Sequence, residues 1–216
     1  MKWTNLLEKL KTQTNICKLC LKTTQNPSIL NFLDKNFLIC NECFNSLNPK
    51  WRKFQVDYIK AIAVYDYDET IKSLLYQFKG CFDYELKDVF FISCYKELSL
   101  IYKDYYIVPI PSYYKDDEER EFNHVKEMYK CLGLKMIDIL EKTNHFKQAN
   151  NTSQDRLLVN NYIRLKNCDK LSGKNILIVD DVFTTGSTMR AAIKLVRSLK
   201  PKDIKILVMA KTLYKD

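Results

Sequence analysis

Short apolar runs alternate with longer amphipathic segments along most of this chain of 216 residues. The apolar runs have the length and β-branched content of strands, whereas the longer segments carry apolar residues three and four positions apart, as helices do. The predicted strands are residues 61–67, 105–110, 136–140, 174–179 and 204–210. Parallel strands need long crossover connections, which helices of about ten residues or more provide. The pattern therefore predicts an α/β fold with a mainly parallel sheet flanked by helices on both faces.

Helical periodicity predicts helices between these strands. Asp68 or Thr70 can cap a first helix that runs to about Phe78 and ends at Gly80. A second helix, residues 84–102, places a set of apolar residues on one face: Leu86, Val89, Phe90, Cys94 and Leu98. The remaining prediction comprises helices at residues 123–132, 154–161 and 187–199, a connecting segment at residues 50–59 and a charged loop at residues 115–121.

The N-terminal residues have the spacing of a short amphipathic helix, with Trp3, Leu6, Leu7 and Leu10 on one face. Packing on the body of the protein is its ordinary role, and binding to a membrane surface is the alternative. No apolar run approaches the roughly 18 residues that span a bilayer, and no signal peptide pattern is present. We therefore expect a cytoplasmic protein that is not an integral membrane protein. Peripheral association with the inner face of the membrane stays open.

The length suits one medium α/β domain with a small appended module. We expect residues 1–50 to form the N-terminal helix and a cysteine-containing module, and residues 51–216 to form the main domain. Lys and Arg number 35 against 26 Asp and Glu, a net charge of +9. Such an excess favours polyanionic partners such as nucleic acid, although lysines that only solvate the surface give the same count. The lysines are scattered, with small concentrations at residues 50–53 and 194–205.

Four of the eight cysteines form two Cys-x-x-Cys pairs separated by nineteen residues: Cys17, Cys20, Cys40 and Cys43. Each pair offers two thiolates from one tight turn, and this spacing is typical of a four-cysteine zinc site. Four sulfur ligands leave no coordination position for a reactive water, so the predicted zinc is structural. A redox pair is the alternative. The other cysteines are scattered and are interpreted as reduced thiols of a cytosolic protein: Cys81, Cys94, Cys131 and Cys168.

The segment from Ile176 to Met189 joins a predicted strand to a predicted helix through a loop of small hydroxyl residues. Four apolar residues lead to Asp180 and Asp181, and ligands of open α/β sheets bind at the carboxyl ends of strands. Backbone N–H groups of the loop and of the helix start form an anion cradle, and Gly186 permits close approach. The hydroxyl donors are Thr184, Thr185, Ser187 and Thr188. A simple capping cluster would explain these hydroxyls but not the two carboxylates.

This segment resembles the signature with which type I phosphoribosyltransferases bind phosphoribosyl pyrophosphate (PRPP). The resemblance implies that Asp180 and Asp181 hold the ribose and act as the catalytic acids of the family's site. It implies that the 5-phosphate is held by Val182, Phe183, Thr184, Thr185, Gly186, Ser187 and Thr188. Mg²⁺ would arrive with the pyrophosphate of PRPP and needs no dedicated protein site. Because phosphoribosyl transfer depends on positioning and charge stabilisation, the lack of an obvious base says nothing about activity.

A four-cysteine module joined to a C-terminal PRPP loop resembles the ComF family, which is tied to DNA uptake in natural transformation. Similar segments lie between the two motifs: Phe78-Lys79-Gly80, Val108-Pro109-Ile110-Pro111-Ser112 where related enzymes have their pyrophosphate loop, Arg120-Glu121-Phe122-Asn123, and a polar segment with Lys142, Thr143, Gln148 and Arg156. The resemblance places Arg120 among the PRPP-binding residues.

The chain departs from the family pattern between residues 112 and 160. Glu121 replaces a glycine, His124 stands where glutamine is usual, and Asn160 falls one residue later after Arg156 than the pattern prefers. The ordinary alternatives are that Arg120 and Arg156 form surface ion pairs and that His124 lies on a helix surface.

Three functions fit these features. The favoured hypothesis is a ComF-like cytosolic protein that handles incoming single-stranded DNA, binds PRPP or a related phosphoribosyl ligand, and meets protein partners of the DNA-uptake machinery. The basic excess and the aromatic residues (14 Tyr, 11 Phe and 2 Trp) suit a surface on which a single strand stacks. The alternatives are a metabolic phosphoribosyltransferase acting on a nucleobase or amine, and a non-enzymatic PRPP sensor. Whether the chain transfers 5-phosphoribosyl with release of pyrophosphate is open at this stage.

Overall fold

The computed structural model describes residues 15–24, 39–142, 163–166 and 171–213. The chain forms two compact units, Met1–Asn48 and Pro49–Asp216. Several predictions lie outside the described residues: the amphipathic N-terminal helix, the helix at residues 154–161, Arg156 and Cys168. Among the described residues, no helix combines the length and the apolar character needed to cross a bilayer.

In the N-terminal unit, short elements flank the two cysteine pairs. Strands β1 (Asn15–Ile16) and β2 (Thr23–Thr24) pair antiparallel, and the turn between them carries Cys17 and Cys20. Helix α3 (Asn41–Ser46) begins directly after Cys40 and contains Cys43 in its first turn. Each pair is thereby presented by a tight local structure.

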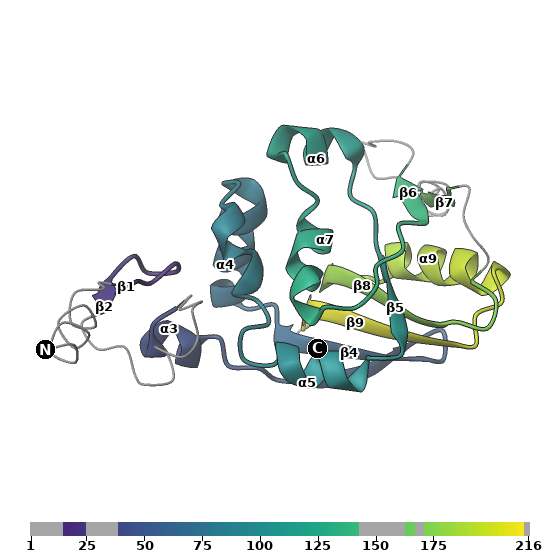
Figure 1. The fold of residues 1–216 in the computed structure, drawn as a ribbon, viewed down its shortest axis with the longest axis horizontal. Helices are drawn as coiled ribbons and strands as arrows, with labels where there is room; N and C mark the ends of the chain where they lie inside the picture. The colour runs from purple at the N-terminus through teal and green to yellow at the C-terminus, as the bar shows by residue number, and fades with distance from the viewer. Residues whose placement is uncertain (1–14, 25–38, 143–162, 167–170, 214–216) are drawn as a thin grey trace, which may run out of the picture. The chain divides into compact units, whose positions relative to one another are not determined.

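The main unit is built on a five-stranded sheet in the order β3-β4-β9-β8-β5 (Figure 1). Its strands are β3 (Arg52–Val56), β4 (Ile59–Asp66), β5 (Tyr105–Pro109), β8 (Asn175–Phe183) and β9 (Asp203–Lys211). Strands β4, β9, β8 and β5 are parallel to one another, which confirms the predicted mainly parallel sheet. The edge strand β3 is antiparallel to β4 and replaces the connecting segment expected at residues 50–59.

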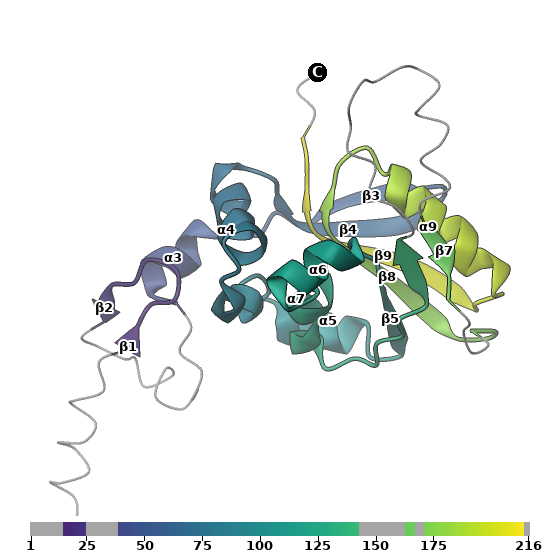
Figure 2. The same ribbon diagram turned by 90° about the horizontal axis from the view of Figure 1, so that it is seen from above.

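Helices cover both faces of this sheet. They are α4 (Glu69–Gly80), η1 (Tyr84–Asp88), α5 (Tyr95–Ile101), α6 (Tyr114–Arg120), α7 (His124–Tyr129), η2 (Lys130–Leu132) and α9 (Ser187–Ser198), with a small antiparallel pair of β6 (Leu140–Lys142) and β7 (Ile163–Leu165). Figures 1 and 2 show α9 and α5 on different sides of the strands.

The centre of the sheet is buried on both faces. In β8, Ile176, Leu177, Ile178 and Val179 are all 0% exposed, although successive side chains point to opposite faces. On one face, Ile176 and Ile178 share an apolar cluster with residues of α9. On the other, Tyr129 of α7 places its hydroxyl 2.9 Å from the Asp180 carbonyl oxygen and 3.0 Å from that of Leu207. Burial on both faces explains why the strand has a continuous rather than an alternating apolar pattern.

The prediction of one helix over residues 84–102 is wrong. Only η1 and α5 are helical there, and turns connect them. The predicted apolar positions are all buried, but so is Phe91, which gives three consecutive buried side chains from Val89 to Phe91. One face of a regular helix cannot bury three consecutive residues, so the chain breaks the helix to do so.

The charged segment at residues 115–121 forms helix α6 instead of a loop. Its sequence has no apolar stripe, and its helix is supported by Arg120 lying 3.7 Å from Asp116 and 3.8 Å from Asp117, one turn earlier. The strand expected at residues 136–140 is reduced to a bridge between Met136 and Ile107, and β6 begins only at Leu140.

Helix α6 ends at Glu121, whose φ of 63° lies in the left-handed region that favours glycine. We expect Glu121→Gly to stabilise the protein by about 1 kcal/mol, because it removes the strain of a side chain at this position. Glu119→Gly, at an exposed position inside the same helix, should destabilise by a similar amount. Thermal unfolding of both variants checks the prediction, and equal losses of Tm would contradict it.

Candidate functional site

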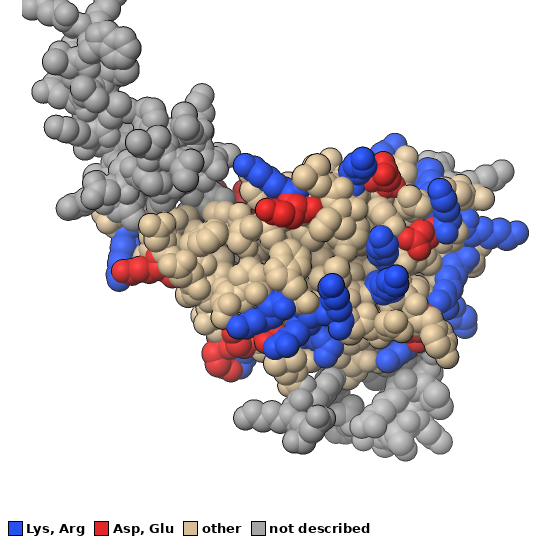
Figure 3. All heavy atoms as spheres, turned by 90° about the horizontal axis from the view of Figure 1, so that it is seen from below, with Lys and Arg blue, Asp and Glu red and all other residues tan. Residues whose placement is uncertain are grey.

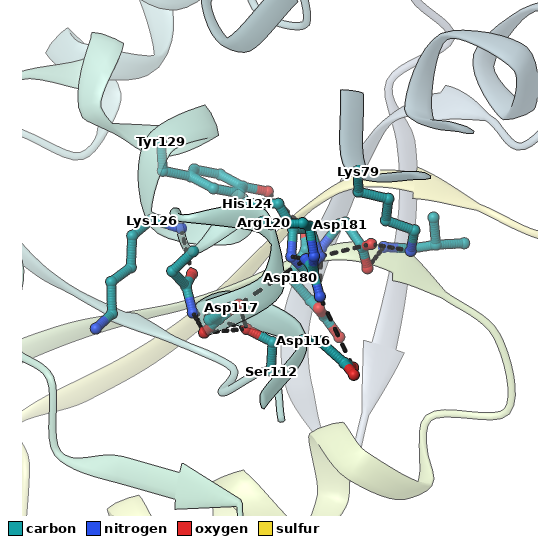
Figure 4. A network of polar contacts seen from close by, with 12 residues as sticks. Lys79, Ser112, Asp116, Asp117, Arg120, His124, Lys126, Tyr129, Asp180 and Asp181 are labelled. Atoms are coloured by element: carbon teal, nitrogen blue, oxygen red, sulfur yellow. Dashed lines mark hydrogen bonds and ion pairs between the residues drawn. The ribbon is translucent and has the colours of Figure 1, made fainter. Parts of the chain in front are cut away.

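A pocket of about 440 Å³ opens at the carboxyl end of the sheet. It is lined by α4, by the segment after β5, by α6 and α7, by the end of β6, by β8, and by the start of α9. The polar lining residues include Lys79, Ser112, Asp116, Arg120, His124, Lys142, Asp180, Asp181 and Thr188. Figure 4 shows most of these side chains converging from separate elements.

Asp181 is the centre of the polar network. Its carboxylate is only 8% exposed, and one oxygen, Oδ2, accepts hydrogen bonds from Lys79 Nζ at 2.8 Å and from His124 Nε2 at 3.1 Å. The other oxygen accepts the Val182 N–H at 2.6 Å. This carboxylate therefore ties α4 and α7 to the central strand β8.

Arg120 fixes the tautomer of His124. Its guanidinium lies 2.7 Å from Nδ1 of His124, and a guanidinium can only donate. Nδ1 is therefore the acceptor, and Nε2 carries the hydrogen that is donated to Asp181. His124 is 7% exposed, so the prediction that it lies on a helix surface is wrong. Arg120 lines the pocket, with a side chain only 9% exposed.

The two adjacent acids have opposite electrostatic environments. Burial alone raises the pKa of Asp181, but the hydrogen bond from His124 and the charge of Lys79 outweigh it and hold that pKa below the usual range. For Asp180, burial raises the pKa well above the usual range, and the negative charge of Asp181 adds to the rise. The pair thus contains one carboxylate held ionised and one driven towards its protonated form.

Strand β8 extends beyond the acids instead of ending at them. It continues to Phe183, so Val182 and Phe183 are strand residues paired with β9. The ring of Phe183 packs on Phe54 of β3, with ring centroids 4.8 Å apart. The irregular loop before α9 is therefore shorter than the segment to which the sequence assigned phosphate contacts.

Gly186 shapes the start of α9. Its φ is 75°, and a Cβ at this position would lie 2.6 Å from the Phe183 ring, so a larger residue does not fit. Gly186 is also the N-cap of α9 and provides no side-chain cap, which leaves the first backbone N–H groups of a twelve-residue helix free to bind an anion. Of the predicted loop residues, only Thr188 lines the same pocket as the two acids.

The two partners of the Asp181 carboxylate, Lys79 and His124, were not predicted as site residues from the sequence. Lys79 lies 102 positions from Asp181 and His124 lies 57 positions from it. Both residues occur in segments that resemble motifs of the ComF family, and this resemblance was the one indication in the sequence that they could belong to the site. Neither residue has a local pattern that predicts an ionic contact with β8.

The four predicted zinc ligands come together in the N-terminal unit. The sulfur atoms of Cys17, Cys20, Cys40 and Cys43 all lie within 4.8 Å of one another, a group that could hold a metal ion. The Sγ atoms of Cys20 and Cys40 are 3.8 Å apart. Zinc–sulfur bonds of about 2.3 Å place tetrahedral ligands about 3.8 Å apart, so the spacing fits zinc.

Backbone amides favour the thiolate form within this group. The N–H groups of Cys20 and Cys40 point at Cys17 Sγ, at 3.5 and 3.3 Å. Burial raises the pKa of the Cys17 thiol, but these amides outweigh burial and lower it to about 6. Metal ligation requires the thiolate, so the local backbone prepares Cys17 for it.

Comparison with known proteins gives three results. The model of the phosphoribosyl transferase domain family matches residues 125–215. Competence protein ComFC of Bacillus subtilis is 33% identical over 132 residues, which cover 60% of this chain and 55% of that protein. ComFC of Streptococcus pneumoniae is 29% identical over 143 residues, which cover 66% of this chain and 64% of that protein. The chain thus matches less than two thirds of the length of either relative.

Among solved structures, a purine phosphoribosyltransferase from Pyrococcus horikoshii is similar with a TM-score of 0.36 and 20% identity, covering 56% of this chain and 70% of that chain.

The opposite environments of the two acids predict opposite effects on stability. At neutral pH, Asp180→Asn should stabilise the protein by about 1 kcal/mol, because it removes a disfavoured charge and keeps the oxygen that accepts the Asp181 N–H at 2.9 Å. Asp181→Asn should destabilise it by about 2 kcal/mol, because an amide faces the donors of Lys79 and His124.

The pH dependence gives the second half of this test. The pKa of Asp180 is higher in the folded state than in the unfolded state, where it is near 4. Ionisation of Asp180 therefore destabilises the folded protein increasingly as pH rises above about 4. The stability gained by Asp180→Asn should shrink as pH falls back towards that value. The stability that ionised Asp181 contributes should persist to below pH 4. Denaturant unfolding across pH measures both, and losses of equal size in the two variants would contradict the assignment.

Proposed function

Because this chain is homologous to the ComFC competence proteins and carries a phosphoribosyl transferase domain, we propose that it binds PRPP in the pocket at the carboxyl end of the sheet and handles incoming single-stranded DNA in the cytosol. One observation carries the first part of the proposal. Asp180, Asp181, Thr188 and Arg120, each assigned to PRPP from the sequence, line one pocket although three separate elements supply them.

The pocket offers a complementary group for each part of the ligand. The ribose hydroxyls would donate to the carboxylates of Asp180 and Asp181, and the 5-phosphate would lie at the start of α9, where backbone N–H groups lack a side-chain cap. Arg120 and the segment around Ser112 also line the pocket, and the pyrophosphate would extend towards them. Mg²⁺ bound to the pyrophosphate would neutralise part of its charge.

Lys79 and His124 both donate hydrogen bonds to the carboxylate of Asp181. Both donate to the same oxygen, Oδ2, so the first step of binding is an exchange or sharing of that acceptor. Arg120 reaches the pocket through its contact with His124, and it also lies near Asp116 and Asp117. The site is therefore preorganised by its own ion pairs, which should limit the entropy lost on binding.

Calorimetric titration of the full-length protein with Mg–PRPP tests this site. We expect binding by the wild type and a loss of at least about tenfold in affinity in Asp180→Asn. This substitution keeps the backbone hydrogen bond and replaces the other carboxyl oxygen, the proposed acceptor for a ribose hydroxyl, by an amide NH2. Asp138→Asn is the matched control, because Asp138 pairs with Lys126 and Lys166 away from the pocket.

Absence of binding by the folded wild type would reject the proposed ligand. Equal affinity in all three proteins would reject the assigned residues. Where binding is found, pyrophosphate release in the presence of a nucleobase or amine decides between an enzyme and a PRPP-binding module. Absence of release with any acceptor tested would favour the module.

We also propose that the four cysteines hold one structural zinc ion. The cluster supplies four thiolates and no open ligand position, and the unit that carries it is too small to fold on a hydrophobic core alone. The main unit carries its own core, so the metal serves the N-terminal unit.

Metal analysis of the purified protein should find one zinc per chain. Cys17→Ser should abolish it and unfold the N-terminal unit, because a structural zinc supplies that unit's folding free energy. Cys81→Ser, at an exposed cysteine outside the cluster, should keep the zinc. Binding of Mg–PRPP should survive removal of the zinc by a chelator. Full zinc content in Cys17→Ser would contradict the ligand set.

A further inference from the structure

The sheet carries a second set of hollows at its other end, where β4 and β9 begin. One hollow, of about 490 Å³, is lined by the β3–β4 turn and the start of β9. Another, also about 490 Å³, lies between β3, β4 and the end of α5. The two share Lys60 and Lys205, so they form one continuous track, here called the basic track. None of the residues that line it lines the PRPP pocket.

The basic track has a strong excess of positive charge. Its basic residues are Lys53, Lys60, Arg197, Lys200, Lys202 and Lys205, and the acid among its lining residues is Asp203. The Asp203 carboxylate already accepts a hydrogen bond from the Tyr105 hydroxyl. Figure 3 shows a face on which Lys and Arg outnumber acidic residues, with blue side chains dense at the right of the view, where β9 begins in Figure 1.

The lysines of the basic track have no carboxylate partner among the described residues. Within the described part of the chain, no ion pair joins any lysine of the track to a carboxylate. Some lysines elsewhere do form ion pairs, for example Lys72 with Glu69 and Lys130 with Glu127. Positive charge is concentrated here without an internal partner, which favours an external polyanion.

The strand register places three of these lysines side by side. Ala61 of β4 pairs with Ile206 of β9, so Lys60 and Lys205 are neighbours one step earlier along the same strands. Lys60 also pairs with Gln55 of β3. Lys53 lies two positions before Gln55 on the same face, diagonal to Lys60. Like charges on neighbouring strands repel, and an anion lying across the strands would relieve that repulsion.

Tyr58 adds an aromatic ring to the basic track. It is 95% exposed at the turn between β3 and β4. Both turn residues have positive φ, 48° for Asp57 and 66° for Tyr58, a turn geometry that favours Asn and Gly. A bulky residue in this conformation is strained, and the exposed ring gains no packing energy in compensation. Its cost in stability therefore points to a role in binding.

The second hollow gives the track an apolar floor. Ile62 and Ile101 line it, and Ile101 is 57% exposed at the end of α5. A double-stranded nucleic acid keeps its base faces stacked inside the helix and presents mainly its sugar-phosphate backbone to such a surface. A single strand also presents base faces, which stack on aromatic rings and cover apolar side chains.

We propose that the basic track binds single-stranded DNA, with phosphates along Lys53, Lys60, Lys202 and Lys205 and a base stacked on Tyr58. The assignment rests on the proposed function and gives it a location at the end of the sheet opposite the phosphoribosyl pocket. Charge complementarity and the exposed ring together favour a single strand over an anionic membrane, since a flat lipid surface makes no stacking contact with Tyr58.

Fluorescence anisotropy of labelled oligothymidylate with the full-length, zinc-loaded protein tests the proposal. Tyr58→Asn should raise Kd at least about fivefold by removing the stacking platform, whereas Tyr58→Phe should keep the wild-type Kd. Because Asn fits the turn, Tyr58→Asn should not lower Tm. Lys60→Gln/Lys202→Gln should make the slope of log affinity against log salt shallower by about 1.4, from about 0.7 for each lost phosphate contact.

The control Lys72→Gln/Lys130→Gln removes the same charge away from the track and should leave that slope unchanged. Binding of Mg–PRPP should be normal in every variant. If the two double lysine variants weakened DNA binding equally, or if Tyr58→Asn kept the wild-type Kd, the assigned surface would be wrong. The proposal that the protein handles DNA would be unaffected. Failure of the wild type to bind oligothymidylate would reject both. Anionic vesicles that bind through the same residues and displace oligothymidylate would overturn the choice of partner.

Discussion

The structure depends on two adjacent carboxylates at the end of one central strand, of which Asp181 is buried and Asp180 is partly buried. Each buried charge costs several kcal/mol unless it is paired and hydrogen-bonded. The chain meets this constraint asymmetrically: Lys79 and His124 converge on Asp181, and Asp180 shifts towards its neutral form. A symmetric solution would need a second set of cations in a space that the phosphoribosyl ligand is proposed to fill.

The positions of several other elements follow from that pairing. His124 can donate to Asp181 only because Arg120 holds its other nitrogen as an acceptor, and Arg120 in turn lies on a helix made of charged residues. The corner between α6 and α7 is fixed by Asn123, which caps α7 and donates to Asp117 and Ser112. Ser112 belongs to the segment after β5. One buried acid thus organises four elements around one pocket.

Sequence patterns predicted those parts of the fold that arise from local or repeated chemistry. The continuous apolar run before Asp180 indicated a strand buried on both faces, and the spacing of the cysteines indicated that they would meet. The same patterns failed where tertiary contacts decide the structure. Helix α6 is held by ion pairs, so it has no apolar stripe from which a helix could be predicted. The helix predicted at residues 84–102 is interrupted because three consecutive side chains are buried there.

The contacts of Lys79 and His124 with Asp181 could not be predicted for a different reason. They join residues far apart in the chain, and only the crossover topology of the sheet brings α4 and α7 to the same strand end. His124 also has the polarity of a surface residue, so its burial follows from its partners and not from its type. A sequence pattern can identify the acid at a strand end, but the cation that balances it depends on the fold.

A mainly parallel sheet has two chemically different ends, and this chain uses both. At the carboxyl end, acids and a helix start provide a compact polar pocket, as expected for such sheets. At the amino end, the antiparallel strand β3 widens the sheet and adds Lys53 beside Lys60 and Lys205. Strands β8 and β9 run between the two ends of the sheet. The Tyr129 hydroxyl donates to a backbone carbonyl of each strand, that of Asp180 in β8 and that of Leu207 in β9.

The separation of the two ends has a physical consequence for the proposed ligands. PRPP and a single strand of DNA are both polyanions, and at one site they would compete for the same cations. Placed at opposite ends of strands that are buried along their centres, they can bind together, and any coupling between them must pass through the sheet itself. A rigid, doubly covered sheet favours simultaneous occupancy with weak coupling over exclusion of one ligand by the other.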